Sequence, residues 1–514
     1  MQLSSERPTL SLCLGARRYP IMAAPHFTGL FLWPLDLLWP LHRDDPFALR
    51  LLLLPLGALS IALTHRLASR FGGARLATLV AFGMASSSCF VCLTSIVQCF
   101  ETLPWVFLVA ALLLVTDLPA LAPGADARSE APTRRLVAAS VCVGLALLAN
   151  VKAVFLLAPL ALLAWRLGAR VDRIGRAQWW RMALAAAIPL LPILAPIVID
   201  PSMRWSQGRG SNLGGDIAAN LAHPGKLFEA ARDLILEWAD FGRYMTRSPA
   251  NALSVAAAAT VCAFVLYDTA RTLVRRRGCV VTAACGVTIV TYLAVVALLY
   301  AEFPANYTPL HAVFGVATGC AVDRFVGPLH GRALRITLAA LALAPFAFGT
   351  VDSIRAFESV EFVTNSRVER DLVAHLIAHP EPDAETVTVN LLAGGVPDAI
   401  SRGRVHTVQA HPWLGACEHD DDGVDLATCL HARWTSLLRG LRDARTVRVV
   451  MPTSLAFVSR PPTLLEAQRA GLEAAARELG LSLRLERTFY TPRNAPAALL
   501  LRVARVDLRD ARMP

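Results

Sequence analysis

Long apolar blocks alternate with short polar connections through the first 350 residues. A helix needs about 20 apolar residues to cross the hydrocarbon core of a bilayer. About ten stretches approach this length, at 47–67, 76–94, 103–115, 136–148, 154–165, 182–199, 252–267, 279–299, 310–322 and 334–350. The pattern predicts an all-α transmembrane bundle over residues 47–350.

Arginines occupy every second connection of this predicted bundle. They cluster near 66–75, 128–135, 166–181, 271–277 and 324–335. The connections at 100–102, 151–152 and 302–306 carry only Lys152 as a basic residue. Because cytoplasmic loops hold an excess of Lys and Arg, the arginine-rich connections should face the cytoplasm. The segment 1–46, the large loop at 200–250 and the chain after about residue 350 should then lie outside.

A different pattern begins after the last apolar block. Helical periodicity appears at 367–379, 425–443 and 463–479, and strand-like runs appear at 386–392, 405–408, 446–451, 483–489 and 497–503. This alternation predicts an extracytoplasmic α/β domain over residues 351–514. No nucleotide-binding fingerprint follows any of these strands, so we assign the domain no catalytic role.

The composition supports a membrane protein. Charged residues make up 17% of the chain, against about 25% in soluble proteins, and the mean hydropathy is +0.48. The net charge is +11. Many of the arginines that produce it lie in short loops between apolar blocks, where basic residues set the orientation of the membrane spans. We therefore expect a lipid bilayer as a partner and no nucleic acid.

Several short motifs follow one another in a fixed order. Tyr19-Pro20 opens an apolar loop, Phe47-Ala-Leu-Arg50 begins the first block, and Arg66-Leu-Ala-Ser-Arg70-Phe-Gly72 ends it. Glu101-Thr-Leu103 opens the third block, and Asn150-Val-Lys152 forms a hairpin tip. This series resembles membrane glycosyltransferases of the GT-C superfamily, in the protein-mannosyltransferase-like and aminoarabinose-transferase-like bacterial branch. The likeness covers residues 19–165 and is looser to about residue 350.

The resemblance implies a juxtamembrane helix within residues 1–46 and an enzyme of the bacterial inner membrane. Such enzymes transfer a sugar from a polyprenyl-phosphate donor to a lipid, glycan or protein acceptor on the outer face, often with a divalent metal such as Mg or Mn. The family also has a first span that ends in an acidic residue. We expect such a span to be encoded upstream of Met1.

Two residues are the main catalytic and binding candidates. Glu101 lies at the outer start of a span, where a carboxylate can act as a base or hold the metal. The alternative for Glu101 is a solvated residue favoured by the helix dipole. Lys152 lies at the hairpin tip and suits a donor phosphate, and the alternative is a lysine that extends to the interface.

The outer loops hold weaker candidates. Arg204 and Arg209 lie beside and within a glycine-rich stretch that is able to cradle phosphate, although a solvated flexible loop is the simpler explanation. Tyr19 and His26 are predicted to line the outer cleft. The segment 227–244 predicts an amphipathic helix on the membrane surface, and His311 flanks an outer span boundary.

Most of the eleven cysteines lie in apolar blocks, as Cys89 does, where cysteine acts as a small apolar residue. Cys417 and Cys429 lie in the predicted outer domain, where a disulfide is favoured. Zinc bound with His419 and His431, or two free thiols, are the alternatives.

Two other functions remain open at this point. A transporter or flippase for lipid-linked sugars would use the same bundle, although transporters tend to show internal repeats and none is evident. A non-catalytic membrane protein of envelope assembly is the second alternative.

Overall fold

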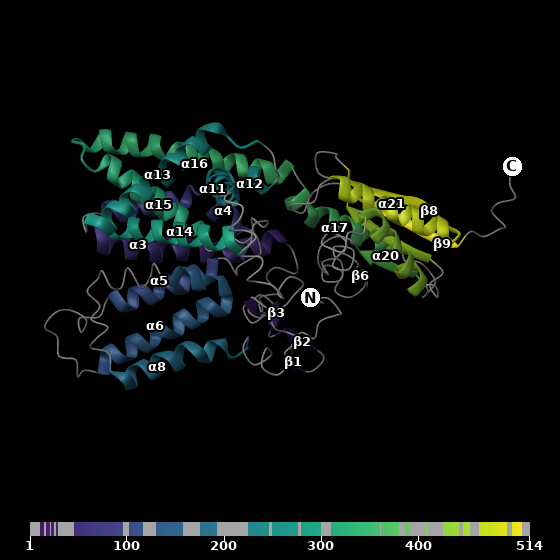
Figure 1. Cartoon of the computed structure of the whole chain (residues 1–514), viewed down its shortest axis with the longest axis horizontal. Coiled ribbons are helices and arrows are strands. Elements are labelled where there is room, and N and C mark those ends of the chain that lie inside the picture. Colours follow the sequence, from purple (N-terminus) through teal and green to yellow (C-terminus); the bar gives the residue numbers. More distant parts are fainter. Residues whose placement is uncertain are drawn as a thin grey trace. The chain divides into compact units, whose positions relative to one another are not determined.

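The computed structural model describes residues 11–14, 17–20, 22–24, 27–28, 46–95, 102–116, 130–157, 175–192, 225–245, 249–275, 279–299, 310–359, 361–379, 386–390, 405, 407–409, 425–441, 446–452, 462–490 and 496–505. The chain divides into two compact units (Figure 1). We call Thr9–Ile354 the helical unit, and the part from Arg355 to Pro514 the sheet unit.

Helices make up nearly all of the described part of the helical unit. They are α3 (Pro46–Ala85), α4 (Ser88–Ser95), α5 (Thr102–Thr116), α6 (Glu130–Ala149), η3 (Val151–Leu156), α8 (Arg176–Ala187), η5 (Ile188–Leu190), α11 (Gly225–Ala239), α12 (Phe241–Met245), α13 (Ala252–Arg275), α14 (Val280–Leu299), α15 (His311–Val326) and α16 (Arg332–Ser359). Every apolar block predicted from the sequence coincides at least partly with one of them. The structure is thus mainly helical, as expected.

Within the described ranges, two helices are individually long and apolar enough to cross a bilayer, at Ala252–Val274 and Arg332–Ala356. The stretches Thr102–Thr116 and Val280–Ala294 are apolar but shorter. The count of ten spans therefore remains a prediction.

Two short hairpins precede these helices, and the sequence patterns did not predict them. Strands β1 (Ser11–Leu14) and β2 (Arg17–Pro20) pair antiparallel, as do β3 (Met22–Ala24) and β4 (Phe27–Thr28). The strands are only two to four residues long, so they are too short to show a clear alternation of apolar and polar positions. The expected juxtamembrane helix lies outside the described residues.

We expected a polar loop between the first two predicted spans, at 67–76. Helix α3 covers both spans, but the backbone at Gly73 is not helical (φ +71°), so α3 consists of two helices joined by a kink within the expected loop. Glycine adopts this left-handed conformation without the steric cost that a side chain adds. The arginines of the expected loop therefore lie on either side of a helical kink.

Helices α3 and α15 cross unusually closely. A methyl group added to Gly315 would lie 2.5 Å from Cα of Met84, and Gly319 is similarly close to Val80. Farther along the same antiparallel pair, Arg75 Nε donates to Asp323 Oδ1 at 2.6 Å. Small residues let two helix backbones approach in this way. The contact fixes which end of α15 lies beside which end of α3.

The exterior of the helical unit is apolar. Among the described residues, all exposed large apolar side chains except Leu485 and Tyr490 lie in this unit, and Phe82, Trp180 and Val274 are examples. Water-soluble proteins rarely expose large continuous apolar surfaces. An exterior of this kind suits helices that face lipid.

Residues 225–245 correct one expectation. We predicted one amphipathic helix on the surface, but the structure has α11 and α12 with a break at Asp240, and the end of α11 is buried. Leu227, at the start of the predicted helix, is half exposed, whereas Trp238 is fully buried. Gly349 of α16 and Gly242 allow this corner to pack closely against α16.

The sheet unit contains a mixed five-stranded sheet of order β6-β5-β7-β9-β8. Its elements are α17 (Glu361–Ala378), β5 (Thr386–Asn390), β6 (Thr407–Gln409), α20 (Leu426–Gly440), β7 (Thr446–Pro452), α21 (Pro462–Glu478), β8 (Leu481–Tyr490) and β9 (Pro496–Arg505). Strands β5, β6 and β7 run parallel, and β9 is antiparallel to β7 and β8. The predicted helices and strands of this region are all present, with small differences in bounds.

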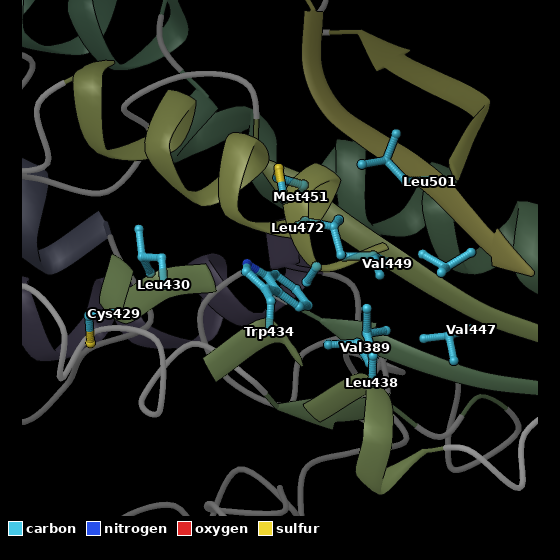
Figure 2. Packing of buried hydrophobic residues seen from close by; sticks show 12 residues of the cluster. Val389, Cys429, Leu430, Trp434, Leu438, Val447, Val449, Met451, Leu472 and Leu501 are labelled. Atoms are coloured by element: carbon cyan, nitrogen blue, oxygen red, sulfur yellow. The ribbon is translucent and has the colours of Figure 1, made fainter. Parts of the chain in front are cut away.

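Helices cover both faces of this sheet. Figure 2 shows the core on one face, where Trp434 and Leu430 of α20 and Leu472 of α21 meet Val389 and Val449. On the other face, α17 packs against alternate residues of the strands. Strand β7 shows why: successive side chains of a strand point to opposite faces, so Val449 faces α20 and Val450 faces α17.

Candidate functional site

Six polar residues gather in the interior of the helical unit, and we call them the buried polar cluster. Four elements supply them: Ser88 and Cys89 from α4, Glu237 from α11 with Asp240 just after it, His311 from α15, and Ser353 from α16. Each is at most 3% exposed. Burying polar groups costs free energy unless they are hydrogen-bonded, so their partners decide what the cluster can do.

Glu237 and His311 form the shortest contact between side chains of α11 and α15. Nε2 of His311 lies 2.7 Å from Oε1 of Glu237. The thiol of Cys89 donates to the backbone carbonyl of Glu237 at 2.7 Å. The donor atoms of these three side chains all lie within 4.8 Å of one another. A thiol, a carboxylate and an imidazole therefore converge on one point.

Asp240 has a separate set of partners. Its Oδ1 accepts hydrogen bonds from the Ser353 hydroxyl at 2.6 Å and from the backbone N–H of Arg243 at 3.2 Å. The second bond caps the short helix α12. Oδ2 of Asp240 is buried and bonds to none of the described residues. Burial raises the pKa of Asp240, while the two hydrogen bonds act in the opposite direction.

Aromatic rings and hydroxyl groups hold this corner rigid. Trp238 stacks on Phe314 with ring centroids 4.7 Å apart, and its indole N–H donates to Thr318. The backbone N–H of Phe241 donates to Ser88 at 3.0 Å. These contacts fix the end of α11 against α4 and α15, so the carboxylate of Glu237 has little freedom to move.

The two ends of the α3–α15 pair differ in chemistry. Cys89 lies near His311 at one end, and the Arg75–Asp323 pair lies at the other. At about 1.5 Å per residue, the segment from Arg75 to Cys89 spans roughly 20 Å. The loop arginines predict that the Arg75 end faces the cytoplasm. The buried polar cluster would then lie toward the outer face, where the sequence placed the chemistry.

A small apolar cavity lies between α3, α5, α14 and α15. Its volume is about 60 Å³, and Leu67, Leu108 and Val316 are among the side chains that line it. Its few polar wall groups include Thr64, which accepts a hydrogen bond from Trp105 Nε1 at 2.9 Å. The cavity offers apolar contacts and no carboxylate, so it is a space for hydrocarbon rather than a site of proton transfer.

The structure describes few of the site residues predicted from the sequence. Tyr19 lies in β2 and Lys152 in η3, but neither side chain is described. The others fall outside the described residues: Glu101, His26, Arg204, Arg209 and Cys417. Their roles stay predictions. Asn150, the first residue of the predicted hairpin tip, is buried.

The predicted disulfide is described at one end only. Cys429 is disulfide-bonded, and its proposed partner Cys417 is outside the described residues. The pairing of Cys417 with Cys429 therefore stays a prediction.

Sequence reasoning missed Glu237 and Asp240, and it treated Cys89 only as a small apolar residue. One signal was present for Glu237. The apolar stripe of α11 runs through Ala230 and Leu234, and Glu237 follows three residues later on nearly the same face. An acid within an apolar stripe indicates a buried carboxylate with a specific partner.

The comparisons with known proteins bear on the fold. No protein-family model and no curated protein matches the sequence. The solved structure of ArnT from Cupriavidus metallidurans bound to undecaprenyl phosphate is similar to the chain, with a TM-score of 0.51 and 12% sequence identity over 94% of this chain and 89% of that one. The apo state of ArnT gives a TM-score of 0.47 at 14% identity over 88% and 83%. The similarity to the first of these structures confirms the predicted resemblance for the fold.

Proposed function

We propose that this chain is a membrane glycosyltransferase of GT-C type. In the proposed reaction it takes a sugar from a polyprenyl-phosphate donor and transfers it to an acceptor outside the cytoplasm. The observation that carries the proposal is the similarity to ArnT over 94% of the chain, because the solved relative was bound to undecaprenyl phosphate. The apolar exterior of the helical unit supports a location in the bacterial inner membrane.

The proposed chemistry is a single displacement with inversion. An acceptor hydroxyl attacks the anomeric carbon of the donor sugar and loses its proton to a carboxylate. The bond between this carbon and the phosphate oxygen breaks, and the polyprenyl phosphate leaves as an anion. Glu101 is our proposed base or ligand of a divalent ion such as Mg or Mn, and Lys152 is our proposed partner of the phosphate.

Tyr19, His26, Arg204 and Arg209 are proposed to line the donor and acceptor sites. The isoprenoid chain of the donor is apolar, so the cavity between α3 and α15 is the proposed place for part of it. The sheet unit is proposed to lie outside the cytoplasm, with a disulfide between Cys417 and Cys429. Unreduced peptide mapping tests that pairing.

The full chain in lipid nanodiscs tests the function. It is supplied with a pool of radiolabelled polyprenyl-phosphate sugars and with envelope lipids and glycans as acceptors. We expect label to reach an acceptor, and Glu101→Gln to lower turnover on the order of 10²-fold or more. Glu229→Gln changes an exposed glutamate of α11 and should have no effect. Lys152→Ala should raise the donor KM, whereas Lys226→Ala, at the only other lysine, should not.

Two outcomes would contradict the proposal. Donor that crosses the bilayer of a proteoliposome without any sugar transfer would identify a flippase. A wild-type protein that neither transfers nor moves any donor in the pool would favour the non-catalytic role.

A further inference from the structure

We infer that Cys89, Glu237 and His311 form a Zn²⁺ site that joins three helices of the bundle. Its ligands do not include Glu101, the residue that the family resemblance assigned to a metal. It does not depend on sugar transfer, because the inference comes from the geometry of the buried polar cluster alone.

The donor types select the metal. Mg²⁺ and Ca²⁺ prefer oxygen ligands, whereas thiolate and imidazole donors are typical of Zn²⁺. Cysteine, histidine and glutamate each bind zinc in proteins, at about 2.0–2.3 Å. The three residues come from α4, α11 and α15, so one ion would cross-link elements that are far apart in the sequence.

Charge balance supports an ion at this depth. An isolated charge in an apolar interior is very costly. Zn²⁺ with one thiolate, one carboxylate and one neutral imidazole has no net charge. Binding releases the thiol proton of Cys89 and any proton shared by Glu237 and His311, and these protons pass to solvent. The complex is therefore neutral in a place where at most 3% of each ligand residue is exposed.

The donor atoms have to rearrange around the ion, and the bond from the Cys89 thiol to the carbonyl of Glu237 would break. Donor atoms around a tetrahedral zinc lie about 3.3–3.6 Å apart, given the usual bond lengths. The contact between His311 Nε2 and Glu237 Oε1 is 2.7 Å and would open by about 0.6 Å, while all three donors already lie within 4.8 Å. The stacked Trp238 and the Ser88 hydrogen bond hold α11 in place around them. Such support by neighbouring groups is usual for metal sites.

The first experiment uses the wild-type full chain, purified in detergent, stripped with a chelator and dialysed against Zn²⁺ or Co²⁺. Elemental analysis should find one Zn²⁺ per chain. The Co²⁺ form should show a thiolate-to-metal charge-transfer band in the near ultraviolet. Cys429 cannot supply that thiolate, because it is disulfide-bonded. A metal-free protein, or a Co²⁺ form without the band, would overturn the inference even if every variant failed to fold.

Variants then locate the site. Cys89→Ser should abolish the charge-transfer band, and His311→Asn should lower bound Zn²⁺ by tenfold or more at limiting metal. The matched control is Cys92→Ser, because Cys92 is also buried on α4 but is not part of the donor set. A second control, His431→Ala in the sheet unit, should keep both signals. Loss of metal in His431→Ala with retention in Cys89→Ser would assign the ion to the sheet unit and refute the inference.

Discussion

The two units of this protein bury charged groups in different ways. In the sheet unit, the guanidinium of Arg448 binds the carboxylate of Glu486 through two parallel hydrogen bonds of 2.6 and 3.0 Å. A third bond joins Arg448 to the backbone carbonyl of His379. Arg448 is 6% exposed, so a permanent cation and a carboxylate neutralise each other inside the protein.

In the helical unit, the carboxylates of the buried polar cluster have other partners, unlike Asp323, which pairs with Arg75. Those described for Glu237 and Asp240 are an imidazole, a hydroxyl group and a backbone N–H. A neutral imidazole can bind a metal ion, and a hydroxyl carries no charge. The comparison teaches that the Arg448–Glu486 pair is already complete, whereas the buried polar cluster retains the capacity to bind a proton or a cation.

Loss of one partner from the complete pair should have the largest effect. Arg448→Met leaves Glu486 without its guanidinium, and such a change costs about 3–5 kcal/mol in the free energy of unfolding. Faster hydrogen exchange in β7 and β9 of the full chain should show it. The double variant Arg448→Met/Glu486→Leu removes both charges and should recover most of the protection.

A matched surface pair makes this test sharper. Arg439 contacts Glu478 at 2.8 Å, but its side chain is 64% exposed. Arg439→Met should therefore cost about 1 kcal/mol or less. If Arg448→Met and Arg439→Met lowered the free energy of unfolding equally, burial would not explain the contribution of the Arg448–Glu486 pair.

A smaller loss is expected where the helices that frame the buried polar cluster cross. A methyl group at Gly315 would lie 2.5 Å from Cα of Met84, so Gly315→Ala should force α3 and α15 apart. Overpacking of this kind costs about 1–3 kcal/mol. Gly225→Ala is the control, since nothing lies within 4 Å of the added methyl group. Thermal unfolding of both variants in detergent measures the difference, and identical melting temperatures would refute the tight crossing.

Glu237→Gln should affect stability less than either of these changes. The amide keeps a hydrogen bond to His311, so we expect a loss of about 1 kcal/mol or less in metal-free protein. A loss as large as that of Arg448→Met would show that Glu237 and His311 form a structural ion pair. Thermal unfolding of the wild type and of Glu237→Gln in detergent, both with chelator, distinguishes a hydrogen bond from an ion pair.

The smallest effect should be an opposite response of the two units to acid. Burial raises the pKa of Asp240 above 3.8, so the folded protein binds its proton more tightly than the unfolded chain. This group therefore adds stability as the pH falls through its raised pKa toward 3.8. Burial lowers the pKa of His375 below 6.5, so the sheet unit loses stability as the pH falls below 6.5.

Hydrogen exchange resolved by peptide separates these two responses. Across the acidic range, amides of α17 should become less protected, and those of α12 should become more protected. Asp240→Asn should abolish the second trend and preserve the first. If protection changed in the same direction in α12 and α17, the opposite pKa shifts assigned to Asp240 and His375 would be contradicted.

Secondary structure was largely predictable in both units, because it depends on patterns within a few turns of the chain. The strand-like run at 446–451 predicted β7, and the helical periodicity at 463–479 predicted α21. The arginines near Gly73 predicted the break between the first two spans, but not that the break is a kink, because a glycine beside arginines is equally typical of a polar loop. The burial of α11 was also missed, since an apolar stripe does not distinguish a membrane surface from another helix.

The sequence by itself determined the helical bundle, the order of strands and helices in the sheet unit, and the resemblance that led to the GT-C fold. Only the tertiary structure decided that Cys89, Glu237 and His311 meet. Glu237 contacts residues 148 and 74 positions away. Hydrophobic periodicity specifies which face of a helix is buried. It does not specify the other helix that covers this face. That choice depends on close contacts such as those of Gly315 and Gly349, which become visible only when the helices are packed.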